Sequence, residues 1–138
     1  MRRLILCAAL IAIGGCTPPA GAPETPPAAE RAAATIATVT APQEGATVTS
    51  PLRISGVAPA DWFFENQFPV RLIDAQGAEI ASAPAHPRIN WTEPGPKEFD
   101  AELSFTATGP AILVLQEDMP GEGETPREVR VQLVLAGE

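Results

Sequence analysis

The chain has 138 residues, with 9 basic and 17 acidic side chains and a formal net charge of −8 at pH 7. An acidic chain repels nucleic-acid phosphates and anionic lipid head groups, so neither is expected as a partner. Its 16 prolines and 11 glycines interrupt the candidate helical segments beyond residue 15, which excludes the helical fold classes.

The first fifteen residues have the organisation of an export signal. Arginines at positions 2 and 3 precede an apolar core over residues 4–13, and two glycines stand before Cys16. A basic start, a short apolar core and small residues before a cleavage point are typical of a secretory signal. The core is too short for a transmembrane helix, which takes roughly twenty residues. Removal of residues 1–15 would leave 123 residues with 7 basic and 17 acidic side chains, a net charge of −10.

The run that ends at Cys16 resembles the lipobox of bacterial lipoproteins, in which a lipid-modified cysteine becomes the first residue of the mature chain. The resemblance implies three acyl chains, palmitate among them, on Cys16, which would attach the protein to a membrane. It places the protein in the cell envelope, on the outer face of the cytoplasmic membrane or in the outer membrane. The alternative is an ordinary signal peptide in which this cysteine is incidental.

Residues 16–34 are expected to form the lipidated cysteine and a disordered Pro/Ala-rich tether. The segment Thr-Pro-Pro-Ala at 17–20 recurs at 25–28, and such a composition cannot form a core. Proline favours an extended spacer of about 3.1 Å per residue, so the tether could reach roughly 50 Å. The remaining cysteine, Cys7, lies in the signal, so the domain that follows has no thiol and depends on a packed core.

Residues 35–138 predict a single all-β domain, an antiparallel sandwich of about seven short strands. Alternating apolar and polar residues mark most of these strands. Residues 112–115 are continuously apolar, which favours a central strand covered on both faces, and Pro69 favours the start or the edge of its strand. In chain order, the expected strands cover residues 36–40, 52–54, 68–72, 78–83, 99–105, 112–115 and 129–135.

Three blocks of sequence carry a family resemblance. The first is Pro42 to Gly45 followed by Val48 to Gly56; the second is Phe64-Glu65-Asn66 followed by Val70 to Asp74 and Gly77; the third is the alternation from Phe99 to Phe105. Together they resemble Gmad2, the immunoglobulin-like domain named for bacterial spore germination proteins. The resemblance implies an immunoglobulin-like sandwich over residues 36–135. The loop from Asp118 to Thr125 departs from the family's short polar turn.

The sequence shows no set of residues with the spacing of an active site or a metal site. His86, the only histidine, stands beside a proline in a predicted loop, where a solvated side chain is the usual role. The acidic residues 117–124 match no calcium-loop spacing, although calcium binding there stays open. We therefore expect no enzyme activity, no cofactor and no metal.

Three adjacent aromatic residues, Trp62, Phe63 and Phe64, lie in a predicted loop. They cannot all face one core, and Phe64 occupies a core-like position of the resembled family. We therefore expect Trp62 or Phe63 to be exposed. Two roles stay open: a binding patch that includes Trp91, because aromatic residues are enriched at interfaces, or a plug that closes the open end of the sandwich, which is the more ordinary role.

These features favour a non-enzymatic, lipid-anchored envelope protein whose immunoglobulin-like domain binds or positions another envelope protein. The alternative is a module that binds cell-wall glycan or a small ligand through Trp62, Phe63 and Trp91. The germination label of the resembled family does not by itself fix a role.

Overall fold

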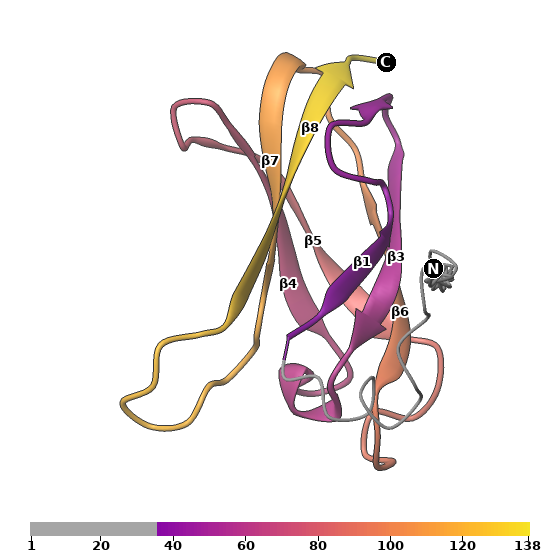
Figure 1. Ribbon diagram of the computed structural model, residues 1–138, viewed down its shortest axis with the longest axis vertical. Coiled ribbons are helices and arrows are strands. Elements are labelled where there is room, and N and C mark those ends of the chain that lie inside the picture. Colours follow the sequence, from indigo (N-terminus) through magenta and orange to yellow (C-terminus); the bar gives the residue numbers. More distant parts are fainter. Residues whose placement is uncertain (1–35) are drawn as a thin grey trace, which may run out of the picture.

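The computed structural model describes residues 36–138, which fold into two facing β-layers (Figure 1). The predicted signal, Cys16 and the tether lie outside the described residues. The elements, in chain order, are β1 (Thr38–Ala41), β2 (Thr47–Val48), β3 (Leu52–Ala58), the 3₁₀ helix η1 (Ala60–Trp62), β4 (Phe68–Asp74), β5 (Glu79–Pro87), β6 (Lys97–Leu103), β7 (Thr108–Gln116) and β8 (Glu128–Ala136).

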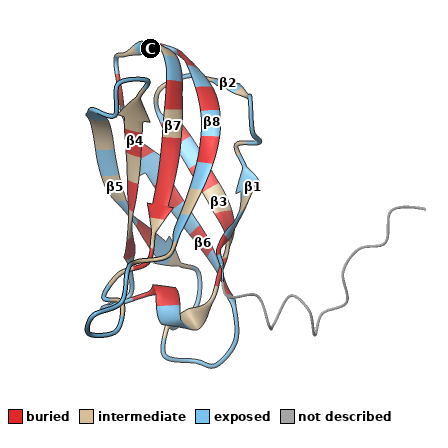
Figure 2. Cartoon of the chain, turned by 60° about the vertical axis from the view of Figure 1, so that its left-hand side comes forward, coloured by how far each residue is buried: buried red, intermediate tan, exposed pale blue. Residues whose placement is uncertain are grey.

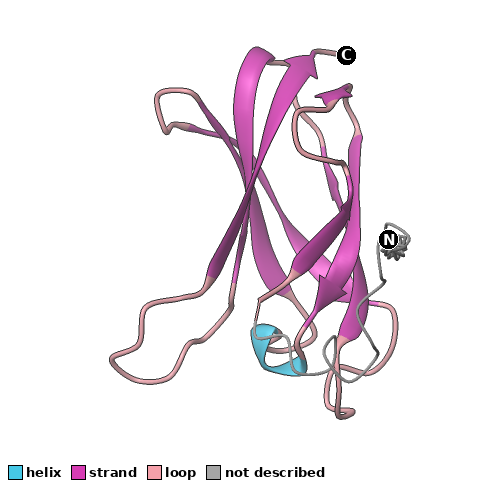
Figure 3. Cartoon of the chain, in the orientation of Figure 1, coloured by secondary structure: helices cyan, strands magenta, loops and turns pink. Residues whose placement is uncertain are grey.

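One layer contains β1, β3 and β6, and the other contains β5, β4, β7, β8 and β2. Strand β5 joins the two layers, because its residues 79–85 pair with β4 whereas His86 and Pro87 pair with β6. Neighbouring strands are antiparallel except β2 and β8, which are parallel. The predicted all-β, immunoglobulin-like sandwich is therefore confirmed (Figure 3).

The sequence predicted seven strands, and the eighth is β2. It has only two residues, too few for an alternating pattern to register. The chain reaches it by crossing from the first layer to the second, with Gly45 at a φ of +78°, a backbone conformation that glycine adopts readily. The Gly45 N–H then donates to the Gln132 carbonyl of β8 at 2.7 Å.

Gly56 shows how closely β1 approaches β3. A Cβ atom at this position would lie 2.1 Å from the Thr38 carbonyl oxygen and 2.8 Å from the ring of Phe99. No side chain therefore fits at Gly56, and β3 continues beyond it to Ala58.

The core lies between the layers (Figure 2). It contains inward-facing residues of every strand from β3 to β8, together with Ala37, Trp62, Phe63 and Phe105 from outside these strands. Edge-on aromatic pairs connect it from one end to the middle. Phe68 stands 5.7 Å from Trp62, 5.1 Å from Phe63 and 5.0 Å from Phe99, measured between ring centroids. Such pairs stabilise a core beyond the area that they bury.

Pro69 and the apolar run of β7 largely follow their predictions. Pro69 is the second residue of β4, as its missing N–H requires. Strand β7 lies between β4 and β8, so its central position is confirmed. Within residues 36–138, no helix is long and apolar enough to cross a membrane.

Candidate functional site

The structure corrects the predicted exposure of the aromatic loop. Trp62 is 0% exposed and Phe63 is 3% exposed, whereas Phe64 is 39% exposed. The turn after Phe64 explains the reversal. Glu65 and Asn66 both have positive φ angles, and the backbone of Phe64 pairs with Gln67, so the chain reverses there and turns Phe64 outward. Trp62 and Phe63 are the plug at the end of the sandwich.

Trp91 does not complete an exposed aromatic patch either. It is half-buried and packs against the core. The three residues predicted to form a binding patch therefore contribute mainly to packing. A sugar-binding surface of stacked, exposed rings is not what the structure builds from them.

The acidic loop between β7 and β8 is held by an ion-pair cluster. Glu117, which is 9% exposed, pairs with the Arg127 guanidinium, and its Oε2 also accepts the Arg127 backbone N–H at 3.1 Å. Arg127 also lies 2.9 Å from Asp61 and 5.8 Å from the centroid of Trp62. The hydrogen bond from Arg127 lowers the pKa of Glu117. This cluster fastens the loop to η1.

The cluster changes how the acidic residues 117–124 are interpreted. Glu117 points at Arg127 and is already engaged, which removes one oxygen donor from the loop. Among residues 36–138, no group of three or more His, Cys, Asp or Glu side chains is placed to hold a metal ion.

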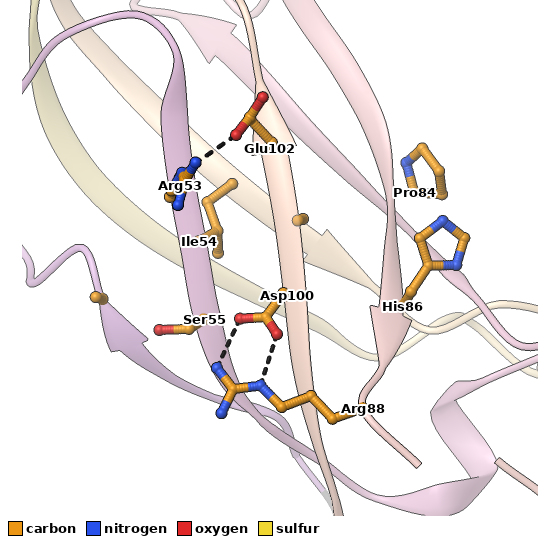
Figure 4. A pocket seen from close by; sticks show the side chains of 10 residues that line it. Arg53, Ile54, Ser55, Pro84, His86, Arg88, Asp100 and Glu102 are labelled. Atoms are coloured by element: carbon orange, nitrogen blue, oxygen red, sulfur yellow. Dashed lines mark hydrogen bonds and ion pairs between the residues drawn. The ribbon is translucent and has the colours of Figure 1, made fainter. Parts of the chain in front are cut away.

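His86 lines a hollow of about 600 Å³ over β3, β6 and the end of β5 (Figure 4). Its Nδ1 lies 3.1 Å from the Asn66 carbonyl oxygen, so this nitrogen is the donor and carries the proton. Ser55 also lines the hollow, but Figure 4 places Ser55 and His86 on opposite sides of Asp100. The Ser55 hydroxyl therefore does not lie next to the His86 imidazole.

Ion pairs cover the outer face of this layer. Arg88 donates to both oxygens of Asp100, at 2.6 Å and 2.8 Å, and lies 3.1 Å from Glu98. Arg53 lies 3.3 Å from Glu102. The hydrogen bond from Arg88 lowers the pKa of Asp100, which keeps this carboxylate charged. The outer face of β3 and β6 is thus a solvent-exposed surface on which acidic and basic side chains form ion pairs.

The outer face of the other layer is different. Val114 in β7 is only 1% exposed, yet it is not part of the core cluster between the layers. It faces outward, because its neighbours Leu113 and Leu115 face the core and successive strand residues point to opposite faces. Arg71 of β4 and Arg130 of β8 stand directly opposite it on either side.

The arginine side chains partly cover this outward valine. Arg71 extends along β7 and donates from Nη2 to the Gln116 side chain at 2.7 Å, which carries its stem past Val114. Long arginine stems commonly cover apolar surface in this way while the guanidinium stays at the surface. The expectation that β7 is covered on both faces is thus only half correct: the core covers one face, and side chains of the same sheet cover the middle of the other.

Next to Val114 the same outer face carries further apolar residues. Ile112 pairs across the sheet with Ile73 of β4, and Pro110 pairs with Val134 of β8. Neither isoleucine packs against the core cluster, and Val134 is 43% exposed. In Figure 2, β8 alternates between buried and exposed residues, whereas residues 111–116 of β7 include no exposed one. We call Ile73, Pro110, Ile112, Val114 and Val134 the outer apolar row.

Two arginines and two acidic residues flank the outer apolar row, and one of these acids, Glu79, pairs across the sheet with Ile73. The Glu128 carboxylate lies 3.7 Å from Arg71 and 3.1 Å from Arg130, so two guanidinium groups share a single carboxylate. The Arg71 Nε is buried and has no hydrogen-bond partner among the described residues. A buried N–H without an acceptor is uncommon and calls for an explanation.

Sequence reasoning missed this surface, although one signal was present. The uninterrupted apolar run Ile112 to Leu115 means that both faces of β7 are apolar. In a sandwich of two layers only one of those faces can meet the core, so the other must either be covered by something else or stay at the surface. The positions of Arg71 and Glu128 beside the row depend on cross-strand register and carry no sequence pattern.

No curated protein and no solved structure matches the chain. A scan against protein families matches residues 36–124 to Gmad2, described as the immunoglobulin-like domain of bacterial spore germination. The match ends before β8, whereas the resemblance in the sequence was expected to continue to residue 135. Because the matched segment covers more than half of the chain, the protein belongs to the Gmad2 family of immunoglobulin-like domains.

Proposed function

We propose that this protein is a lipid-anchored component of the bacterial cell envelope whose immunoglobulin-like domain binds or positions another envelope protein and catalyses no reaction. The anchor is Cys16, the tether gives the domain reach, and the outer apolar row is the contact surface. Membership of an immunoglobulin-like family agrees with a binding role, because such folds carry function in the surfaces grafted on them.

The observation that carries the binding role is the outer apolar row itself. Strands of a two-layer sandwich normally present polar residues on their outer faces. Here Ile73, Ile112 and Val134 stand together on an outer face that no further layer of the described chain covers. Apolar surface rimmed by polar side chains is typical of protein contact sites.

The anchor is tested with Cys16→Ser in the producing cell. The expected result is loss of acylation and transfer of the protein from the membrane fraction to the soluble fraction, because the acyl chains supply the membrane affinity. A Thr17→Ser variant serves as the control and should stay in the membrane fraction. Membrane association of Cys16→Ser that resists salt and carbonate washing would contradict the anchor.

The binding role is tested by photo-crosslinking in cells that make the full chain. A photoreactive amino acid is placed at Ile112 or Val134 on the outer apolar row. Control positions are Arg53, on the outer face of the other layer, and Met119, in the loop between β7 and β8. Met119 is 63% exposed and the Arg53 side chain is 87% exposed, so both controls are accessible.

We expect Ile112 and Val134 to cross-link to one envelope protein, and Arg53 to give no such product. The purified full chain, in detergent, should then bind that purified protein, and Ile112→Asp should abolish the complex without lowering the melting temperature. Retention on cell-wall glycan without any protein cross-link would refute the proposal. Glycan binding through Trp62 and Phe63 is disfavoured, because both side chains are buried.

A further inference from the structure

We infer that the partner presents a carboxylate to Arg71 and Arg130, next to the apolar residues that it packs on the outer apolar row. The inference rests on the proposed function and adds the chemistry of the partner. Arg71 and Arg130 are then specificity-determining residues. Glu128 is the group that competes with the partner's carboxylate for both guanidinium groups.

Charge distribution is the first argument. Residues 36–138 carry six basic and fifteen acidic side chains, so the domain as a whole disfavours acidic partners. The outer apolar row is less acidic than the rest of the domain, because two arginines, Arg71 and Arg130, balance the two acids beside it, Glu128 and Glu79. On the outer face of the other layer, two arginines are outnumbered by Glu98, Asp100 and Glu102. A partner's carboxylate therefore meets less repulsion at the outer apolar row than at the opposite face, and Arg71 and Arg130 are the groups that can bind it there.

Incomplete pairing of Arg71 is the second argument. Its Nη2 donates to Gln116 and lies 3.7 Å from Glu128, a long ion pair, while its buried Nε has no acceptor. A guanidinium has five N–H donors in a planar fork that matches a carboxylate in a bidentate manner. Arg71 is thus held close to Glu128 without the two-bond geometry that Arg88 achieves with Asp100. A partner's carboxylate can supply that geometry after a rotation of the guanidinium.

Position is the third argument. Arg71 and Arg130 stand opposite Val114, one on each side, so the charged and apolar parts of the surface are adjacent. An apolar centre with an arginine at its rim is typical of interface hot spots, in which arginine and large apolar residues are enriched. A second copy of this chain is less suitable, because two domains of the same strong negative charge repel each other.

The test measures affinity between the purified full chain and the envelope protein that cross-links from Val134. Arg130→Glu should weaken binding at least tenfold, and Arg53→Glu, the matched charge reversal on the opposite face, should change it less than twofold. Glu128→Gln should tighten binding several-fold, since it removes the carboxylate that competes for both arginines. A change of the partner's contacting Asp or Glu to Arg should restore binding to Arg130→Glu. The melting temperature of each variant is measured as a check on folding. At Arg71 the variant is Arg71→Met instead of a charge reversal, because methionine keeps most of the side-chain stem over Val114 and disturbs the fold less.

The outcomes separate the two proposals. If Ile112→Asp abolishes binding but Arg130→Glu and Glu128→Gln leave it unchanged, the carboxylate inference is wrong and the proposed function stands. If the cross-linked protein is a second copy of this chain, the inference is also wrong. If no residue of the outer apolar row cross-links to any protein, the proposed contact surface fails and the inference fails with it.

Discussion

The two outer faces of the sandwich are built from strands of similar length around the same core, yet they differ in chemistry. On the outer face of β3 and β6, Arg53 of β3 and Arg88, which follows β5, both pair with carboxylates, and the surface is a set of solvated ion pairs (Figure 4). On β4, β7 and β8, an apolar row occupies the middle of the face and two arginines share one carboxylate. On the face of β3 and β6, the arginines are paired with carboxylates of the domain itself. On the face of β4, β7 and β8, apolar side chains and incompletely paired arginines are available to a partner.

The first prediction concerns the core that both faces share. Trp62→Ala should lower the free energy of unfolding by about 4 kcal/mol, because large aromatic side chains removed from a core cost roughly 3–5 kcal/mol. Trp62 is fully buried and stands edge-on to Phe68. Urea unfolding measures the change. A loss below about 1 kcal/mol would mean that the aromatic loop adds little to the core and is available as a second contact surface.

The second prediction concerns the ion pair at the end of the sandwich. Glu117→Gln should cost about 2 kcal/mol, the scale of a hydrogen bond to a charged group. The pKa of Glu117 is lowered from its ordinary value of 4.5 by Arg127, so its contribution is complete above that value. It is lost as the pH falls through the lower pKa of the folded state.

The pH dependence supplies the measurement for Glu117. The difference in stability between the wild type and Glu117→Gln should be constant from pH 7 to about pH 5 and should shrink at more acidic pH. A difference that grows on acidification would contradict the assigned ion pair. Asp61→Asn is a milder control, because Asp61 is more exposed than Glu117.

The third prediction compares the two faces directly. Val114→Ala should cost about 1.5 kcal/mol, since it removes two buried methyl groups worth roughly 0.8 kcal/mol each. Ser55→Ala, on the outer face of the other layer, should be nearly neutral. Equal changes in the free energy of unfolding at the two positions would show that Val114 is not covered by its arginine neighbours. The two outer faces would then not differ in the way described.

The fourth and smallest prediction concerns a solvated ion pair. Arg53→Ala should change the free energy of unfolding by less than about 0.5 kcal/mol, because exposed pairs contribute little and are screened by salt. The Arg53 side chain is 87% exposed and that of Glu102 is 53% exposed. A larger loss that disappears at 1 M salt would reveal a cooperative network across β3 and β6, and this face would then be more than a solvated surface.

The sequence predicted the fold better than the surface. Alternation of apolar and polar residues placed most of the seven predicted strands, because period-two burial is a local property of each strand, and a continuous apolar run placed β7. The two-residue strand β2 is too short to show this alternation and was not predicted. The orientation of Trp62, Phe63 and Phe64 was predicted wrongly, because it depends on positive φ angles at Glu65 and Asn66. Asparagine adopts such angles more readily than most residues, but glutamate does not indicate them.

The candidate site was hidden for a different reason. Arg71, Val114 and Arg130 come from three strands and meet only through cross-strand register, which no single segment encodes. Lys97 is a similar case: it is 1% exposed, and its ammonium donates to the carbonyl oxygens of Pro94 and Gly95 at 3.1 Å and 2.6 Å. A lysine in an alternating strand does not indicate from sequence that its side chain is buried and bonds to carbonyl groups of the preceding loop.

Cysteine accessibility in the cell tests the central claim most directly. The chain has cysteines only at positions 7 and 16, so Val134→Cys and Arg53→Cys each place one thiol in the domain, on opposite outer faces. Labelling by a membrane-impermeant maleimide is compared between intact envelopes and the same full chain purified in detergent. Position 134 should be several-fold protected in the envelope and reactive after purification, while position 53 should be equally reactive in both. Equal reactivity of position 134 in both states, or protection of position 53 alone, would contradict the proposed contact surface.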